Sequence, residues 1–147
     1  QGETVEQLGI YTVDLIQAIN QKNAQVEPEF INSLINYANE TFNKTKEQNL
    51  LIGVKPWYIF GLANLFASRA ANNILYFNQA KAIFQEGHKL APTRFEFIYG
   101  LLDISLMERD TETAKDLINL AKKLRPDLEQ TKLYEDRLKE IETSLPS

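Results

Sequence analysis

The chain has 147 residues, of which 44% are hydrophobic and 24% charged, as in an ordinary globular protein of one domain's size, and this balance argues against intrinsic disorder. It contains no cysteine and one histidine, which excludes disulfides, thiol catalysis and metal sites built from several cysteine or histidine ligands. The net charge of −4 argues against a nucleic-acid-binding face.

The longest apolar stretch does not suit a membrane span. It covers residues 57–67, is interrupted by Asn64, and is shorter than the roughly 20 residues that a span requires, so we expect no direct membrane insertion. The chain begins QGETVEQ, without a start methionine or a signal-peptide pattern. We expect either a domain excised from a larger protein or a trimmed N-terminus, with the cytoplasm as the default location.

Helical spacing of apolar residues dominates from the first residues onward. A first helix is predicted from a capping box formed by Thr4 and Gln7, and it ends in the polar stretch 22–27. Pro28 suits the first turn of a second helix, because that position needs no backbone donor. The apolar positions of these two helices are Val5, Leu8, Leu15, Ile16 and Ile19, followed by Ile31, Leu34, Ile35, Ala38 and Phe42.

Pro56 opens a third predicted helix, which ends at Asn72 and Asn73 and is apolar around most of its circumference. Such a helix is typical of the buried centre of a helical stack, so we expect the N-terminal hairpin to pack on it. The fourth helix stops before Pro92.

Three more helices are predicted in the last third of the chain. The fifth begins at a capping box of Thr93 and Glu96, the sixth is capped by Asp110, and the seventh by Asp127. The seventh carries an apolar line of Leu128, Leu138, Ile141 and Leu145. Its other face is charged and suits a solvated end of the fold, with Lys132, Glu135, Asp136, Lys139, Glu140 and Glu142.

An internal repeat connects residues 80–92 with residues 114–126, at an offset of 34 residues. Both stretches follow the pattern A-K-x-x-[FI]-x-x-[GA]-x-K-L-x-P. The small residues let two helices approach closely, the large apolar residue fills space between hairpins, and the proline stops the helix.

A period of 34 residues built from helix–turn–helix units resembles the tetratricopeptide repeat (TPR). The resemblance implies an all-α fold of about seven antiparallel helices in a short, TPR-like right-handed superhelix. Residues 1–147 would form a single helical domain, with a degenerate N-terminal hairpin (3–48), two TPR-like repeats (56–92 and 93–126) and a C-terminal capping helix (127–143). The match is incomplete, since Leu102 and Ser105 replace the family's small residue and tyrosine.

The run LAPTRFEFIYGLLDISL, with the hairpins before it, also looks like the soluble tails of some bacterial O-antigen ligase or polymerase-like membrane proteins. This narrower resemblance covers about residues 56–128. It implies fusion to a membrane protein that carries the chemistry, and none of that family's catalytic residues can be assigned here.

Chemistry-bearing motifs are absent from the sequence. His88 stands near the end of the fourth helix, where a cation suits the helix dipole. Glu108, Asp110 and Glu112 are explained by a helix cap and its solvated neighbours. We therefore expect neither an enzyme nor a cofactor.

TPR arrays bind through a concave surface lined by the first helix of each hairpin, and the resemblance projects such a groove onto this chain. A clamp for a terminal carboxylate is disfavoured, since only Arg69, Asn72 and Asn73 approximate one. The apolar content favours a peptide or helix as the ligand, unless the N-terminal hairpin covers some of the aromatic residues. The projected groove residues are Leu62, Leu65, Phe66, Arg69, Asn73, Glu96, Tyr99, Asp103 and Leu106.

The sequence thus predicts a non-enzymatic scaffold that binds a protein or peptide partner. The alternative is a soluble accessory domain of a membrane glycan-assembly protein. The full-length gene would separate the two, because the alternative requires many apolar segments upstream.

Overall fold

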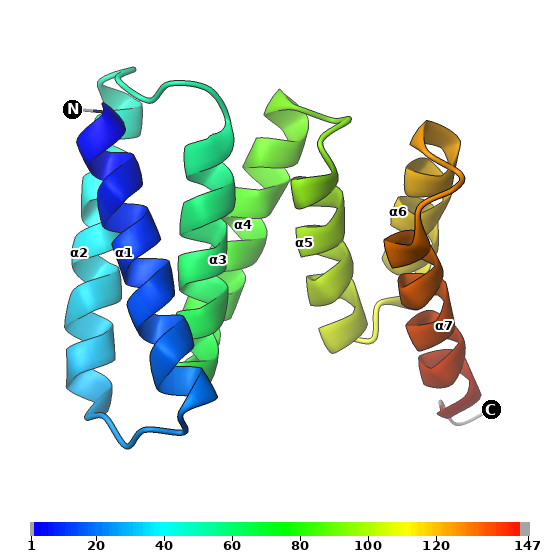
Figure 1. Cartoon of the computed structure of the whole chain (residues 1–147), viewed down its shortest axis with the longest axis horizontal. Helices are drawn as coiled ribbons and strands as arrows, with labels where there is room; N and C mark the ends of the chain where they lie inside the picture. Colours follow the sequence, from blue (N-terminus) through cyan, green and yellow to red (C-terminus); the bar gives the residue numbers. More distant parts are fainter. Residues whose placement is uncertain (1, 145–147) are drawn as a thin grey trace. The chain divides into compact units, whose positions relative to one another are not determined.

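The structure is a computed structural model that describes residues 2–144. Within that range it contains seven α-helices and no strand, which confirms the predicted all-α class. The helices follow one another along the chain as Figure 1 shows. Their bounds are α1 (Gly2–Gln21), α2 (Pro28–Glu47), α3 (Lys55–Ala70), α4 (Ile74–Leu90), α5 (Phe95–Met107), α6 (Thr111–Leu124) and α7 (Glu129–Ser144).

The chain forms two compact units, Gln1–Leu90 and Ala91–Ser147. The first unit contains helices α1 to α4, and the second contains α5 to α7. The boundary between them lies close to Pro92, the residue at which the 34-residue pattern places the end of a repeat.

The helix ends are defined by residues in the left-handed region of backbone space. Asn23, Asn49, Asn72 and Arg109 follow α1, α2, α3 and α5 with φ values of 48°, 55°, 48° and 57°. In each case the next backbone N–H donates to the carbonyl five residues earlier, at 2.9 to 3.1 Å. This is the Schellman arrangement, and asparagine is the side chain that tolerates it best after glycine.

The observed helix starts match some of the predicted ones. Pro28 and Pro56 stand in the first turns of α2 and α3, and the Asp110 side chain accepts a hydrogen bond from the Thr113 N–H at 3.1 Å, as predicted. Two capping boxes are wrong: Thr4 lies inside α1, and α5 begins at Phe95 with Arg94 as its N-cap residue and no side-chain cap.

The predicted cap of the seventh helix is displaced as well. Helix α7 begins at Glu129, two residues after Asp127, whose carboxylate instead lies 3.5 Å from the Arg125 Nε. The residue between them, Leu128, is half-buried, and the predicted apolar position Leu145 lies outside the described residues.

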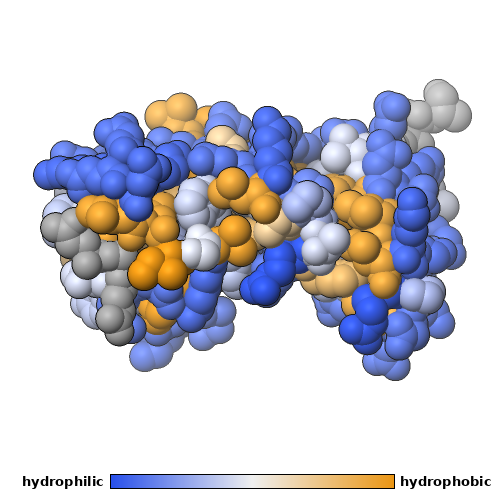
Figure 2. Space-filling model, turned by 90° about the horizontal axis from the view of Figure 1, so that it is seen from above, coloured by the Kyte–Doolittle hydropathy of each residue, from blue (hydrophilic) through white to orange (hydrophobic). Residues whose placement is uncertain are grey.

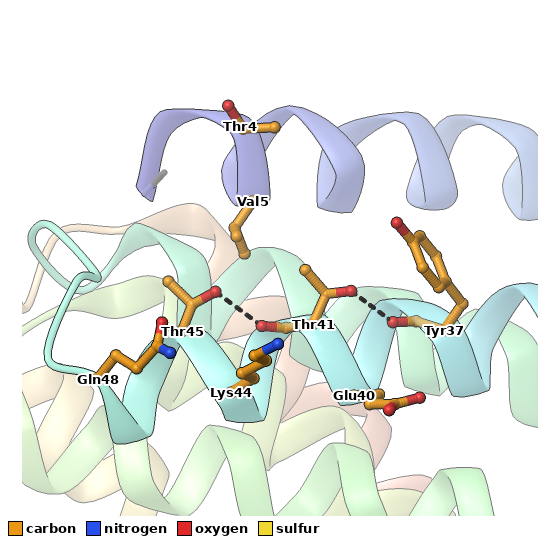
Figure 3. A pocket seen from close by; sticks show the side chains of 8 residues that line it. All are labelled: Thr4, Val5, Tyr37, Glu40, Thr41, Lys44, Thr45 and Gln48. Carbon is orange, nitrogen blue, oxygen red and sulfur yellow. Dashed lines mark hydrogen bonds between the residues drawn. The ribbon is translucent and has the colours of Figure 1, made fainter.

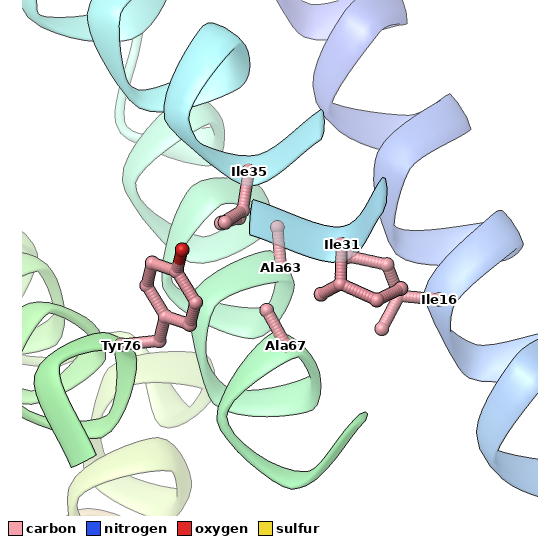
Figure 4. Packing of buried hydrophobic residues seen from close by; sticks show 6 residues of the cluster. All are labelled: Ile16, Ile31, Ile35, Ala63, Ala67 and Tyr76. Atoms are coloured by element: carbon pink, nitrogen blue, oxygen red, sulfur yellow. The ribbon is translucent and has the colours of Figure 1, made fainter. Parts of the chain in front are cut away.

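Helix α3 is the centre of the first unit, and both helices of the N-terminal hairpin pack on it, as predicted. The Phe42 ring of α2 stacks on Phe60 with centroids 4.7 Å apart and meets the Trp57 ring edge-on at 5.7 Å. Helix α1 approaches closely at Gly9, where a Cβ would lie 2.7 Å from the Ile59 side chain. At the other end of the unit, α1, α2, α3 and α4 meet in one cluster (Figure 4), formed by Ile16, Ile31, Ile35, Ala63, Ala67 and Tyr76.

A polar pair is buried inside this unit. Asn64 is fully buried, and its amide exchanges hydrogen bonds with the Asn39 amide in both directions, at 2.7 and 2.8 Å. The Asn64 Nδ2 also donates to the Phe60 carbonyl at 2.8 Å, and Asn39 donates to the Gln79 Oε1 at 2.9 Å. The residue that interrupts the apolar stretch thus links α3 to α2, and Asn39 extends the link to α4.

The repeated positions are buried in both units. Ala80 and Phe84 of α4 are fully buried, as is Ala114 of α6, while Ile118 of α6 is 4% exposed. In the first unit a Cβ placed at Gly61 would collide with the Phe84 ring, so α3 and α4 touch there. The pattern thus coincides with a close helix contact in the first unit and with buried positions in the second.

Candidate functional site

The projected groove residues of the first unit differ in how far they reach solvent. Leu65 is buried, Leu62 is half-buried, and Arg69 is exposed in the last turn of α3. Phe66 is half-buried against the cluster around Ile16, so the N-terminal hairpin covers part of it. The Asn73 Oδ1 accepts a hydrogen bond from the Leu75 N–H at 2.9 Å, so this side chain is already engaged at the start of α4.

Helix α7 engages two projected groove residues of the second unit. The Tyr99 ring stacks on Tyr134 with centroids 5.2 Å apart, and its hydroxyl lies 3.0 Å from the Thr131 Oγ1. The Asp103 Oδ1 accepts from the Tyr134 hydroxyl at 3.0 Å and from the Arg137 Nη1 at 3.3 Å. Burial and the Asp103 carboxylate raise the pKa of Tyr134, so this hydroxyl stays a donor. Tyr99 and Asp103 thus hold α7 against α5.

The two remaining projected residues are also occupied within the chain. Leu106 is buried, and the Glu96 Oε1 lies 3.2 Å from the Arg94 Nη2. Sequence reasoning missed Thr131 and Tyr134, which are both buried on α7. Their signal was present, because Thr131, Tyr134 and Leu138 follow one another at helical spacing of three and four residues.

The single histidine lies apart from the projected groove residues, near the end of the first unit's last helix. His88 is half-buried in the last turn of α4, its Nδ1 is buried without a hydrogen-bond partner, and burial lowers its pKa. Across residues 2–144, the carboxylates and the histidine form no group of three or more that could hold a metal ion. In the same range, no helix has both the length and the apolar character to cross a membrane.

A groove of about 490 Å³ lies between α1 and α2. Figure 3 shows Val5 pointing from α1 toward α2, with Tyr37 rising from α2 toward α1. Two hydroxyls of α2 donate to carbonyls of their own helix, Thr41 to Tyr37 at 2.9 Å and Thr45 to Thr41 at 2.8 Å. The residues lining this groove are Thr4, Val5, Tyr37, Glu40, Thr41, Lys44, Thr45 and Gln48.

Large aromatic side chains are exposed on both helices beside the groove. Tyr11, Phe30 and Tyr37 are 62%, 49% and 61% exposed, which is unusual for large aromatic side chains. Helical spacing of three and four residues puts them in line with half-buried leucines and with the threonines of the groove. We call this surface the outer face; it consists of Thr4, Leu8, Tyr11 and Leu15 on α1 and of Phe30, Leu34, Tyr37 and Thr41 on α2.

Sequence reasoning did not identify the outer face. It placed Leu8, Leu15 and Leu34 among the apolar positions of their helices, and the structure leaves all three half-buried. The available signal was that Tyr11 and Tyr37 extend the apolar stripe of their helices beyond the width that one core contact needs.

Two other surface features are weaker candidates for a binding site. Leu50 and Ile52 are 40% and 79% exposed in the connection between α2 and α3. Figure 2, which looks down on the molecule from above, shows hydrophobic residues at the surface among hydrophilic ones. A shallow hollow of about 350 Å³ around the turn between α6 and α7 is lined by both signs of charge, including the pair of Lys122 and Glu135. Neither combines a groove with aromatic side chains.

Comparison of the chain with family models, with curated proteins and with solved structures finds no match.

Proposed function

We propose that this chain is a non-enzymatic interaction module that binds a helix or peptide through the outer face of α1 and α2. The observation that carries the proposal is the exposure of Tyr11, Phe30 and Tyr37 on one face of one hairpin. Several large aromatic side chains exposed near one another on a protein surface often mark a binding site.

The shape of the outer face supports a helix as the ligand. Two adjacent helices leave a furrow between them, and an amphipathic helix places residues spaced by three, four and seven into such a furrow. Tyrosine and phenylalanine offer large contact areas with few rotatable bonds, so ordering them on binding costs little entropy.

The repeat pattern supports the same class of function. A stack of helical hairpins presents the faces of its terminal hairpins to solvent, and repeat proteins use their extended surfaces to bind partners. We keep the TPR-like right-handed superhelix, and the groove projected from it, as parts of this proposal. Arg69 is the member of that groove that is most open to a ligand in the first unit.

Site-specific photo-cross-linking in the cells that produce the protein tests the proposal. A benzophenone amino acid is placed at residue 37 in the outer face, at residue 69 in the projected groove, or at residue 85, which is an exposed control on α4. We expect an adduct from residue 37, mapping by mass spectrometry to an amphipathic helix. An adduct from residue 69 alone would move the binding surface to the projected groove, and equal labelling from all three positions would contradict both.

A further inference from the structure

The chemistry of the outer face also indicates what covers it, and this inference rests on the proposed function. The face is bounded along α2 by two opposite charges. Glu29 lies in the first turn of α2 and Lys44 in its last turn, and both side chains are exposed. They stand eight residues before and seven residues after Tyr37. At 3.6 residues per turn Lys44 lies about 20° and Glu29 about 80° from Tyr37 around α2, both in the same direction, so they flank one edge of the face that carries Tyr37.

These two charges are symmetric about the middle of the helix. The midpoint between residues 29 and 44 falls between Asn36 and Tyr37, close to the midpoint of α2 itself. If a second α2 lay antiparallel across the first with its centre at this point, each lysine would stand opposite a glutamate. The antiparallel arrangement also pairs the helix dipoles favourably.

The size of the outer face is sufficient for a weak dimer. A helix of 20 residues is about 30 Å long, and two adjacent helices are about 20 Å wide, so the face offers about 600 Å² per copy. Two copies together would bury about 1,200 Å², the lower limit for a specific interface. Interfaces of this size belong mostly to weak, transient complexes.

We propose that a second copy of this chain covers the outer face, with the two α2 helices antiparallel about a two-fold axis near Tyr37. Lys44 of each copy then lies beside Glu29 of the other, and the Tyr37 rings meet at the centre. The four helices α1 and α2 of both copies form an antiparallel bundle whose new core is made by the aromatic residues of the outer face.

The oligomeric state of the whole chain, measured by analytical ultracentrifugation from about 1 to 500 μM, tests this arrangement. We expect a reversible monomer–dimer equilibrium. Tyr37→Ala removes the central contact from both copies and should weaken dimerisation by about 100-fold. Lys44→Glu and Glu29→Lys each place like charges opposite one another twice per dimer, and each should weaken it by about tenfold.

The double variant Glu29→Lys with Lys44→Glu is the decisive measurement, because it restores opposite charges across the two-fold axis and should restore the affinity. Lys89→Glu is the matched control: Lys89 is exposed in the last turn of α4, as Lys44 is in α2, and its reversal should leave dimerisation unchanged. Far-UV circular dichroism of every variant confirms that the helices are intact.

Three results would overturn the inference. A chain that stays monomeric up to 500 μM, a dimer that Tyr37→Ala leaves intact, or a double variant no tighter than either single one excludes this interface. The proposed function would survive the first of these if residue 37 still cross-links to a helix of another protein. It fails together with the inference if residue 37 gives no adduct of either kind.

Discussion

The buried amide pair of Asn39 and Asn64 offers the most direct test of the first unit's packing. Asn64→Ala removes three hydrogen bonds and leaves the Asn39 Oδ1 without its donor at a half-buried position. At about 0.5–1.5 kcal/mol for each bond, with a further cost for the space left behind, we expect a loss of about 2–4 kcal/mol in the free energy of unfolding. Asn39→Ala should cost about 2 kcal/mol, because the Asn64 Oδ1 is then left unpaired at a fully buried site.

The two substitutions should not add. Once either partner is gone, removing the other breaks no further bond between them and relieves an unpaired group, so the double variant should be less destabilised than the sum by about 1–2 kcal/mol. Urea unfolding followed by the fluorescence of Trp57 measures this, because Trp57 is the single tryptophan and lies buried in the first unit. Asn78→Ala, at an exposed position of α4, is the control and should cost less than about 0.5 kcal/mol. If the losses in the free energy of unfolding of the two single variants add up, within error, to that of the double variant, the reasoning is refuted. The two amides then do not stabilise each other.

Three further predictions concern single positions. Ala80→Leu and Ala114→Leu each insert a large side chain where the residue is fully buried, and urea melts should show a loss of about 1–3 kcal/mol for both. Arg109→Gly should raise the melting temperature, because glycine relieves about 1 kcal/mol of left-handed strain at φ 57°. The pKa of His88 is lowered from 6.5 by burial, so the unfolded chain binds its proton more tightly than the folded one. Stability of the first unit should therefore fall as the pH drops below 6.5 toward the lowered pKa, and His88→Gln should flatten a plot of urea midpoint against pH between 7 and 5.

The helices could be predicted from the sequence because their signals are local. Pro28 and Pro56 mark starts, asparagines mark ends, and apolar residues repeat at helical spacing between them. The capping boxes at Thr4 and Thr93 failed because the same residue types also suit a turn or the interior of a helix. At Thr93 the chain makes a turn first, in which the Arg94 N–H donates to the Ala91 carbonyl at 3.1 Å.

The packing between elements could be predicted only in outline. An apolar circumference on α3 correctly indicated that other helices cover it, and Asn64 in that circumference was visible as an interruption. Its partner Asn39 stands 25 residues away on another helix, and no spacing rule connects the two. The contacts of Tyr134 with α5 span 31 to 35 residues and are equally invisible to a search for periodic patterns.

The same limit explains why the sequence pointed to Tyr99 for binding, whereas our proposal rests on Tyr37. Both are tyrosines on the polar edge of an apolar helix stripe, so composition and spacing treat them alike. Tyr99 contacts the Tyr134 ring and the Thr131 hydroxyl of α7, so its ring and its hydroxyl already have partners within the chain. Tyr37 is 61% exposed. The hydroxyls of Thr41 and Thr45 donate hydrogen bonds to carbonyls of their own helix. An exposed aromatic residue is available to a binding partner when no other part of its own chain packs on it. Whether it is covered depends on how the helices pack together, and the sequence around the residue does not reveal this.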